Sequence, residues 1–167
     1  MILTGPEISR EVAAGRIIIS PFNDAQVNPN SYNYRLGPLL ISVDQSGFRI
    51  GRPIDLRMTP VTLEPGRVYL GHTSETIGSS AYVTMLNGRS SIGRLGMFLN
   101  FSADLGHLGP SHQWTLEIMV VQPLTVYWNM KIGQATFWRP VGKIEPYLGE
   151  YARRNEPTPC ICLGRMK

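Results

Sequence analysis

Glycine and proline divide this chain into short apolar segments, and that division constrains its fold more than any other feature. The 167 residues include 17 glycines and 13 prolines. Pairs such as Gly37-Pro38 and Pro65-Gly66 stand between the apolar segments. Because these residues form turns and interrupt regular structure, the pattern predicts many short strands joined by turns, with few long helices.

Nine apolar segments have the length and composition of β-strands. They are rich in β-branched and aromatic residues, and they cover residues 16–19, 31–36, 39–43, 67–73, 81–86, 97–102, 113–121, 124–128 and 131–138. A short helix is expected before them, from about Pro6 to Ala14, with Thr4 as its cap and Gly15 at its end. Strands at this spacing predict an all-β fold, a jelly roll or a related barrel.

The length and net charge of the chain limit the number of domains and the kinds of binding partner that are expected. A chain of this length usually forms one domain, which is expected to span residues 1–167. The strand pattern is lost from Tyr147 onward, so residues 147–167 form either a flexible end or an ordered arm or lid. The net charge is +4, but no basic run with interleaved aromatics predicts a polynucleotide partner.

The first residues, the apolar segments and the cysteines indicate where in the cell the protein is expected. The first residues lack the pattern of a signal peptide, and no apolar segment has membrane-spanning length. The two cysteines, Cys160 and Cys162, are separated by one residue and form no disulfide framework. A cytoplasmic protein without a membrane partner is expected.

Residues 87–96, NGRSSIGRLG, gather polar groups between two apolar strands. Arg89 and Arg94 carry forked donors that suit phosphate oxygens, and Ser90 and Ser91 add hydroxyl and main-chain N–H groups. One interpretation is a polar turn with solvated arginines. The other is a cradle for an anionic ligand, because turns at the ends of strands often carry binding groups.

Glu117 is the only charge in the segment QWTLEIMVV, residues 113–121. Strand alternation places Leu116 and Ile118 on one face, and Thr115 and Glu117 on the other. If the second face is open to water, Glu117 is an ordinary surface residue. If that face lines a closed pocket, desolvation raises the pKa of Glu117, and its carboxyl group can transfer protons near neutral pH.

No metal-ligand pattern accompanies these residues. The zinc-deaminase signature requires His-x-Glu followed by Pro-Cys-x-x-Cys. The chain has Ser74 where that glutamate would follow His72, and its cysteines are spaced Cys-x-Cys. No catalytic metal is expected, and the sequence contains neither a nucleophile elbow nor a Walker loop.

Taken together, the motifs resemble those of the dCTP deaminase branch of the dUTPase-like superfamily. NGRSSIGRLGM is similar to the family's phosphate-binding signature, and TLEI to its Thr-Leu-Glu-Leu strand. NPNSYNYRLG, VTLEPGRVYLGHTSE, NMKIGQATFWR and EYARRNEPTPC resemble four further family elements in the same order. The resemblance therefore extends over nearly the whole chain.

This resemblance implies a homotrimer of distorted jelly rolls with nucleotide sites between subunits. It also implies hydrolytic deamination of a cytosine nucleotide, dCTP above all, without a catalytic metal. Mg²⁺ is expected only on the nucleotide phosphates. The implied catalytic residues are Glu117 as proton shuttle, Ser90 and the main chain of Ala103 as holders of the water, and Arg94 beside Glu117. The implied substrate contacts are Arg89, Ser90, Ser91, Arg94, His107, Thr115, Leu116, Tyr147 and Arg154.

Four positions depart from the family pattern. His107 replaces the aspartate of a turn near the sugar, which in dUTPase relatives also activates water for pyrophosphate release. Asn33 replaces an aspartate, Glu150 a phosphate-facing lysine, and Arg154 a glutamine. A glutamate near a triphosphate repels it unless a neighbouring arginine compensates.

These departures keep other functions open. The substrate could be CTP, CMP, dCMP or a modified cytosine nucleotide. The reaction could be pyrophosphate release from dUTP or dCTP, which the missing aspartate disfavours. A non-catalytic nucleotide-binding trimer would need the cradle but not Glu117.

Overall fold

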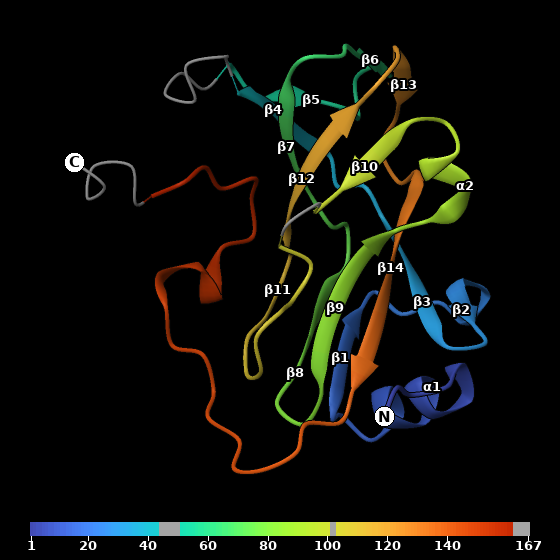
Figure 1. Cartoon of the computed structure of the whole chain (residues 1–167), viewed down its shortest axis with the longest axis vertical. Helices are drawn as coiled ribbons and strands as arrows, with labels where there is room; N and C mark the ends of the chain where they lie inside the picture. Colours follow the sequence, from blue (N-terminus) through green and yellow to red (C-terminus); the bar gives the residue numbers. More distant parts are fainter. Residues whose placement is uncertain (44–50, 101–102, 162–167) are drawn as a thin grey trace.

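Antiparallel strands meet in one apolar core in the computed structural model, which describes residues 1–43, 51–100 and 103–161 (Figure 1). The largest sheet contains, in order, β10 (Met97–Leu99), β12 (Thr115–Val120), β7 (Val68–His72), β4 (Leu39–Val43) and β5 (Ile54–Asp55). The second contains β2 (Val27–Asn28), β3 (Ser31–Arg35), β14 (Lys131–Trp138) and β9 (Val83–Gly88).

Two smaller sheets and a few helical turns complete the described residues. One sheet contains β1 (Ile17–Ser20), β8 (Thr76–Ser79) and β11 (Ser111–His112), and the other β13 (Leu124–Val126) and β6 (Val61–Leu63). The helical elements are α1 (Gly5–Ala13), α2 (Ser90–Gly93), η1 (Asp24–Gln26) and η2 (Glu150–Arg153). The mainly β, jelly-roll-like fold predicted from the sequence is thereby confirmed.

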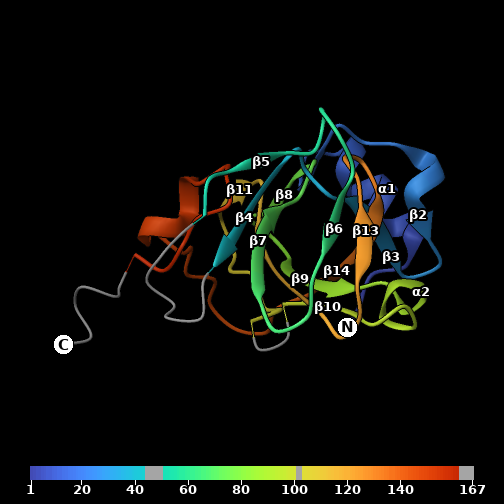
Figure 2. The same cartoon turned by 90° about the horizontal axis from the view of Figure 1, so that it is seen from above.

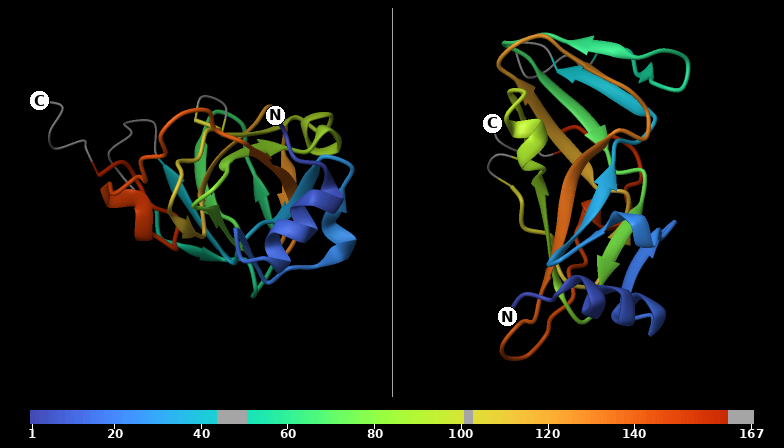
Figure 3. Two further views of the ribbon diagram at one scale, coloured as in Figure 1. Left: turned by 90° about the horizontal axis from the view of Figure 1, so that it is seen from below. Right: turned by 90° about the vertical axis from the view of Figure 1, so that its right-hand side faces the viewer.

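The sheets curve around a common interior when the molecule is viewed from above or below (Figures 2 and 3). The core contains fully buried side chains from both large sheets, including Leu116 and Ile118 of β12 and Tyr34 of β3. Tyr34 fits only because residue 133 is glycine, since a Cβ there would lie 1.9 Å from the tyrosine ring. The interior is thus packed, and ligand space must lie outside it.

A buried ion pair joins Arg35, the last residue of β3, to Glu75, which directly precedes β8. Glu75 is fully buried, and it accepts hydrogen bonds from Arg35 Nε at 2.6 Å and from the Arg35 main-chain N–H at 2.9 Å. Gln26 donates a third bond to the same carboxylate at 3.1 Å. Because a buried carboxylate is stable only with such partners, Glu75 serves the fold.

Each of the nine predicted strands overlaps an observed one, and the segment 131–138 matches β14 residue for residue. The predicted strand 97–102 ends at Leu99, and its last two residues lie outside the described ones. The predicted helix begins one residue earlier, at Gly5, and Gly15 follows it with φ of 70°. Thr4 occupies the cap position, but its side chain makes no capping hydrogen bond.

Five short strands of the described residues were not predicted: β2, β5, β6, β8 and β11. Each has two to four residues, too few for alternation to be recognised. In β8 the sequence TIGS contains Gly78, whose backbone approaches Pro110 so closely that a Cβ would lie 2.1 Å from the Pro110 oxygen. A glycine that permits such an approach weakens the strand signal in the sequence.

Candidate active site

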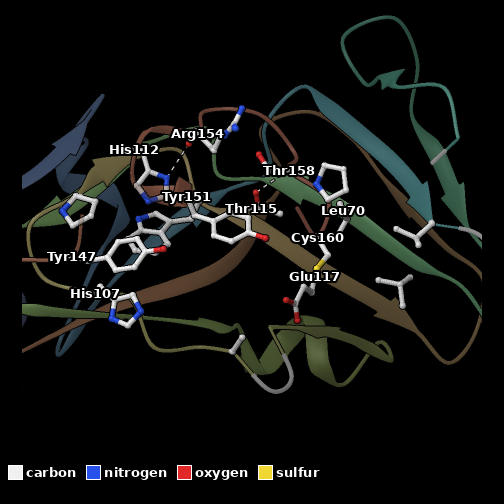
Figure 4. Close-up of a pocket in the computed structure, with 16 residues that line it drawn as sticks. Leu70, His107, His112, Thr115, Glu117, Tyr147, Tyr151, Arg154, Thr158 and Cys160 are labelled. Atoms are coloured by element: carbon white, nitrogen blue, oxygen red, sulfur yellow. Dashed lines mark hydrogen bonds between the residues drawn. The ribbon is translucent and has the colours of Figure 1, made fainter. Parts of the chain in front are cut away.

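A cavity of about 760 Å³ lies between the face of the largest sheet and the C-terminal arm, which we define as residues 147–161 (Figure 4). Strands β4, β7 and β12 supply part of its wall, and the segment before β12 and the arm supply the rest. The lining residues are Val43, Val68, Leu70, Ala103, His107, Pro110, His112, Trp114, Thr115, Glu117, Tyr147, Tyr151, Arg154, Thr158, Pro159 and Cys160.

Strand β12 directs Glu117 into this cavity. Leu116, Ile118 and Val120 are buried, whereas the intervening side chains point outward, as strand alternation predicts. Glu117 pairs with Leu70 across the sheet, and Thr115 pairs with His72. Among the lining residues that the structure describes, Glu117 is the only carboxylate, and its side chain is exposed within a single chain.

The arm is fixed to the start of β12 by hydrogen bonds. The hydroxyl of Thr115 donates to the Glu156 carbonyl at 3.3 Å and accepts from the Thr158 N–H at 3.1 Å. Two residues before Thr115, the Gln113 N–H donates to Asn155 Oδ1 at 3.0 Å. These contacts hold the arm over the wall that carries Glu117.

His112 adds a further anchor. Its Nδ1 lies 2.9 Å from the Arg154 carbonyl and 3.1 Å from the Gln113 carbonyl. Since both neighbours are acceptors, Nδ1 must carry the proton. Burial lowers the pKa of His112, so the neutral ring is favoured. The ring also lies against Trp114, with 4.2 Å between the centroids.

The residues of the predicted cradle lie elsewhere. α2 is a single helical turn that follows β9, with the Arg94 N–H donating to the Ser90 carbonyl at 3.0 Å. Ser90, Ser91 and Arg94 are exposed, and Arg89 donates from its guanidinium to the Lys131 carbonyl at 3.3 Å. α2 and the arm lie on opposite sides of the domain in Figures 1 and 2.

The predicted site residues therefore fall into two groups. Those that line the cavity are Ala103, His107, Thr115, Glu117, Tyr147 and Arg154. Those outside it are Arg89, Ser90, Ser91 and Arg94, on or beside α2. Leu116 does not line the cavity, and its side chain is fully buried in the core.

Several lining residues were not predicted from the sequence, among them Tyr151, Thr158 and Cys160 of the arm. The arm follows no strand or helix pattern, so its path over β12 has no local signal in the sequence. His112 and Trp114 had a usable signal, because His112 directly precedes the predicted strand 113–121 that carries Glu117, and Trp114 lies within that strand.

Within residues 1–43, 51–100 and 103–161, no group of three or more His, Cys, Asp or Glu side chains is arranged to hold a metal ion. In the same residues, no helix is both long enough and apolar enough to cross a membrane.

The fold and the site define a class: a mainly antiparallel-β domain whose arm covers a cavity that carries the carboxylate of Glu117. The chain belongs to the dCTP deaminase-like family, whose sequence profile matches residues 2–140. A crystal structure of 2′-deoxycytidine 5′-triphosphate deaminase from Agrobacterium tumefaciens has a similar fold, with a TM-score of 0.69 and 25% identity. That similarity covers 83% of this chain and 48% of the other.

Curated relatives match over nearly the full length. The "dCTP deaminase, dUMP-forming" of Clostridium beijerinckii is 39% identical, over 96% of both chains. The protein of the same name from Leptospira biflexa is 41% identical, over 96% of this chain and 95% of its own. The "dCTP deaminase" of Rhodopirellula baltica is 36% identical, over 96% of this chain and 84% of its own.

Proposed function

We propose that this protein deaminates dCTP by hydrolysis, with dUTP and ammonia as the products. The observation that carries the proposal is a cavity in which Glu117 is the single carboxylate among the described lining residues. The similarity to curated relatives named dCTP deaminase supports it. Identity of 36–41% over 96% of the chain supports a shared reaction. The cytoplasm is the expected location.

The proposed chemistry uses Glu117 twice. Its carboxylate takes a proton from water, the hydroxide adds to C4 of the cytosine ring, and the proton passes to ring N3. Glu117 then takes the proton of the new C4 hydroxyl and delivers it to the exocyclic amino group. The bond from C4 to that amino group breaks, ammonia leaves, and C4 becomes a carbonyl carbon of uracil. One carboxyl group can act first as base and then as acid when its environment is dry.

The other predicted residues bind or orient. Ser90 and the main chain of Ala103 would hold the water, and Arg94 would lie beside Glu117. Arg89, Ser90 and Ser91 would bind phosphates, with Mg²⁺ carried on the triphosphate as part of the substrate. The remaining proposed contacts are the main chains of Thr115 and Leu116 with the base, and His107, Tyr147 and Arg154 with the sugar and phosphates.

We infer that two copies of the chain contribute to each site, in a homotrimer. Three observations support this inference. Within one chain, α2 lies on the far side of the domain from the arm. Glu117 is exposed, although a proton shuttle needs a dry environment. The apolar side chains of Phe98 and Met119, paired across β10 and β12, are 42% and 46% exposed on the same face.

A second candidate product is dUMP, formed if pyrophosphate is also released. The names of the Clostridium beijerinckii and Leptospira biflexa relatives favour it. His107 lines the cavity where dUTPase relatives are expected to have the aspartate that activates water for pyrophosphate release. Deamination is therefore better supported here than release of pyrophosphate.

A substrate panel tests these proposals. The purified protein is incubated separately with dCTP, CTP, dCMP and CMP, and ammonia, pyrophosphate and the nucleotide products are measured. We expect ammonia and dUTP from dCTP, without pyrophosphate. Pyrophosphate and dUMP would establish the second candidate. Nucleotides that raise the melting temperature without any turnover would instead show a non-catalytic binding protein.

Mixed trimers test the shared site. Glu117→Gln and Ser90→Ala should each be inactive alone. When the two variants are unfolded together and refolded in equal amounts, about a quarter of the sites should receive intact Glu117 and Ser90 from different chains. Recovery of about that share of wild-type activity supports a site between subunits, whereas no recovery is expected if both residues act from one chain.

A further inference from the structure

Asn100 forms hydrogen bonds with both main-chain polar groups of Glu117, the carbonyl and the N–H. Its N–H donates to the Glu117 carbonyl at 2.9 Å, and its side-chain Oδ1 accepts from the Glu117 N–H at 3.0 Å. The residue follows the last residue of β10 and is 7% exposed. Both polar groups of the Glu117 peptide backbone are therefore satisfied by one residue.

The side chain of Asn100 takes the place of a main-chain acceptor. Strand β10 pairs with β12 through Met97–Val120, Phe98–Met119 and Leu99–Ile118, so Asn100 is the next residue opposite Glu117. In a regular antiparallel pair, two such residues exchange both main-chain hydrogen bonds. Here the carboxamide oxygen accepts the second bond, which leaves the Asn100 carbonyl free.

The freed carbonyl accepts from the Ala103 N–H at 3.4 Å. Asn100 has φ of 45°, in the left-handed region, which regular strands do not adopt. Asparagine tolerates that region better than most residues. One residue thus connects Glu117 with Ala103, two positions that line the same cavity.

We propose that Asn100 is a positioning residue for the deamination, holding Glu117 and the Ala103 main chain at a fixed separation. This inference rests on the proposed function, in which Glu117 moves the protons and Ala103 holds the water. Asn100 does not line the cavity. Its effect reaches the reacting atoms through the main chains of these two residues.

The test separates the side-chain acceptor from the turn. Asn100→Gly keeps the left-handed conformation without strain but removes the acceptor. Asn100→Asp keeps both the acceptor and the tolerance of the turn. Because small displacements of catalytic groups lower rates strongly, we expect Asn100→Gly to reduce kcat by roughly 10- to 100-fold. The phosphate-binding residues near α2 are unaffected, so KM for dCTP should stay within about twofold, and Asn100→Asp should restore most of kcat.

Asn129 provides a matched control. It also has a positive φ, of 64°, and its Oδ1 accepts from the Ser74 hydroxyl at 3.0 Å, away from the cavity. Asn129→Gly should retain wild-type kcat. Equal kcat values for Asn100→Gly and Asn129→Gly would overturn the proposal, as would a loss in Asn100→Gly that Asn100→Asp does not restore.

If wild-type protein releases no ammonia from dCTP, the proposed function itself fails. If wild type is active and Asn100→Gly has the same kcat, only the role of Asn100 fails. If Asn100→Gly does not fold, Asn100→Ser replaces it, because the serine hydroxyl is too short to reach the Glu117 N–H. A tenfold lower kcat for Ser than for Asp then supports the role of the acceptor, and equal values refute it.

Discussion

The imidazole ring of His107 stacks on the phenol ring of Tyr147, with 4.6 Å between the centroids and 20° between the ring planes. Tyr147 begins the C-terminal arm, and His107 lies in the segment before β12. Both rings line the cavity (Figure 4). The stack therefore joins the arm to the wall at one end, while the hydrogen bonds of Thr115 join it further along.

His107→Leu should weaken nucleotide binding. An aromatic pair of this kind contributes about 0.5–1.5 kcal/mol beyond its buried area, so loss of the stack should raise KM for dCTP about 2- to 12-fold. Steady-state kinetics give the value. Tyr127→Leu is the control, because Tyr127 is an exposed aromatic outside the cavity. An unchanged KM in His107→Leu would mean that the stack does not support binding.

Thr115→Val should loosen the arm without a change in side-chain size. Valine can neither donate to Glu156 nor accept from Thr158, and one hydrogen bond contributes about 0.5–1.5 kcal/mol. The Thr158 N–H should then exchange with solvent roughly 2- to 12-fold faster, as measured by hydrogen exchange. The Ile161 N–H, which donates to Tyr151 at 3.0 Å, serves as reference. Unchanged exchange at Thr158 would show that Thr115 does not anchor the arm.

Glu75→Gln should destabilise the fold. The substitution removes the charge that pairs with Arg35 in a fully buried position. Because breaking a buried pair leaves its partner uncompensated, we expect a loss of about 2–4 kcal/mol in the free energy of unfolding, measured by denaturant titration. Asp55→Asn breaks the more exposed pair with Arg57 and should cost less than about 1 kcal/mol. Equal losses in the two variants would exclude a special role for Glu75.

Glu11 makes stability depend on acid pH. Its carboxylate accepts from Arg16 Nε and Nη2, both at 2.5 Å, and from the Tyr82 hydroxyl at 3.0 Å. The bonds from Arg16, followed by that from Tyr82, lower the pKa of Glu11 from 4.5 to about 2. A carboxyl group with a lowered pKa stabilises the folded state above its unfolded pKa, and this contribution is lost as protons bind.

The loss should therefore extend from about pH 4.5 down to about pH 2. Melting temperatures measured across this range should fall more steeply for wild type than for Glu11→Gln, which has no proton to bind at this position. The Gln variant should also be less stable at pH 7. Parallel curves for the two proteins would show that Glu11 has the same pKa in the folded and unfolded states.

The sequence predicted the strand that carries the proposed base, because Leu116, Glu117 and Ile118 show clear alternation. It also predicted the polar segment of Arg89 to Arg94, although not that Ser90–Gly93 forms a helical turn. Both signals are local. A strand face and a polar turn can be recognised from the residues that form them.

The hydrogen bonds between Asn100 and Glu117 and the course of the arm could not be predicted in this way. Asn100 is one polar residue at the end of an apolar strand, and its function depends on a partner 17 residues away. Thr115 and Glu156 are 41 residues apart and meet through a carbonyl that every residue possesses. Contacts made by main-chain groups carry no residue-type signal, so only the fold reveals them.

The most direct measurement compares wild type and Glu117→Gln for ammonia release from dCTP under identical conditions, with the nucleotide products separated. Gln keeps the size of the side chain but cannot transfer protons, so kcat should fall by at least about 100-fold while KM stays within about threefold. Wild type should yield ammonia and dUTP in equal amounts. A Glu117→Gln variant with wild-type kcat would rule out Glu117 as the proton shuttle.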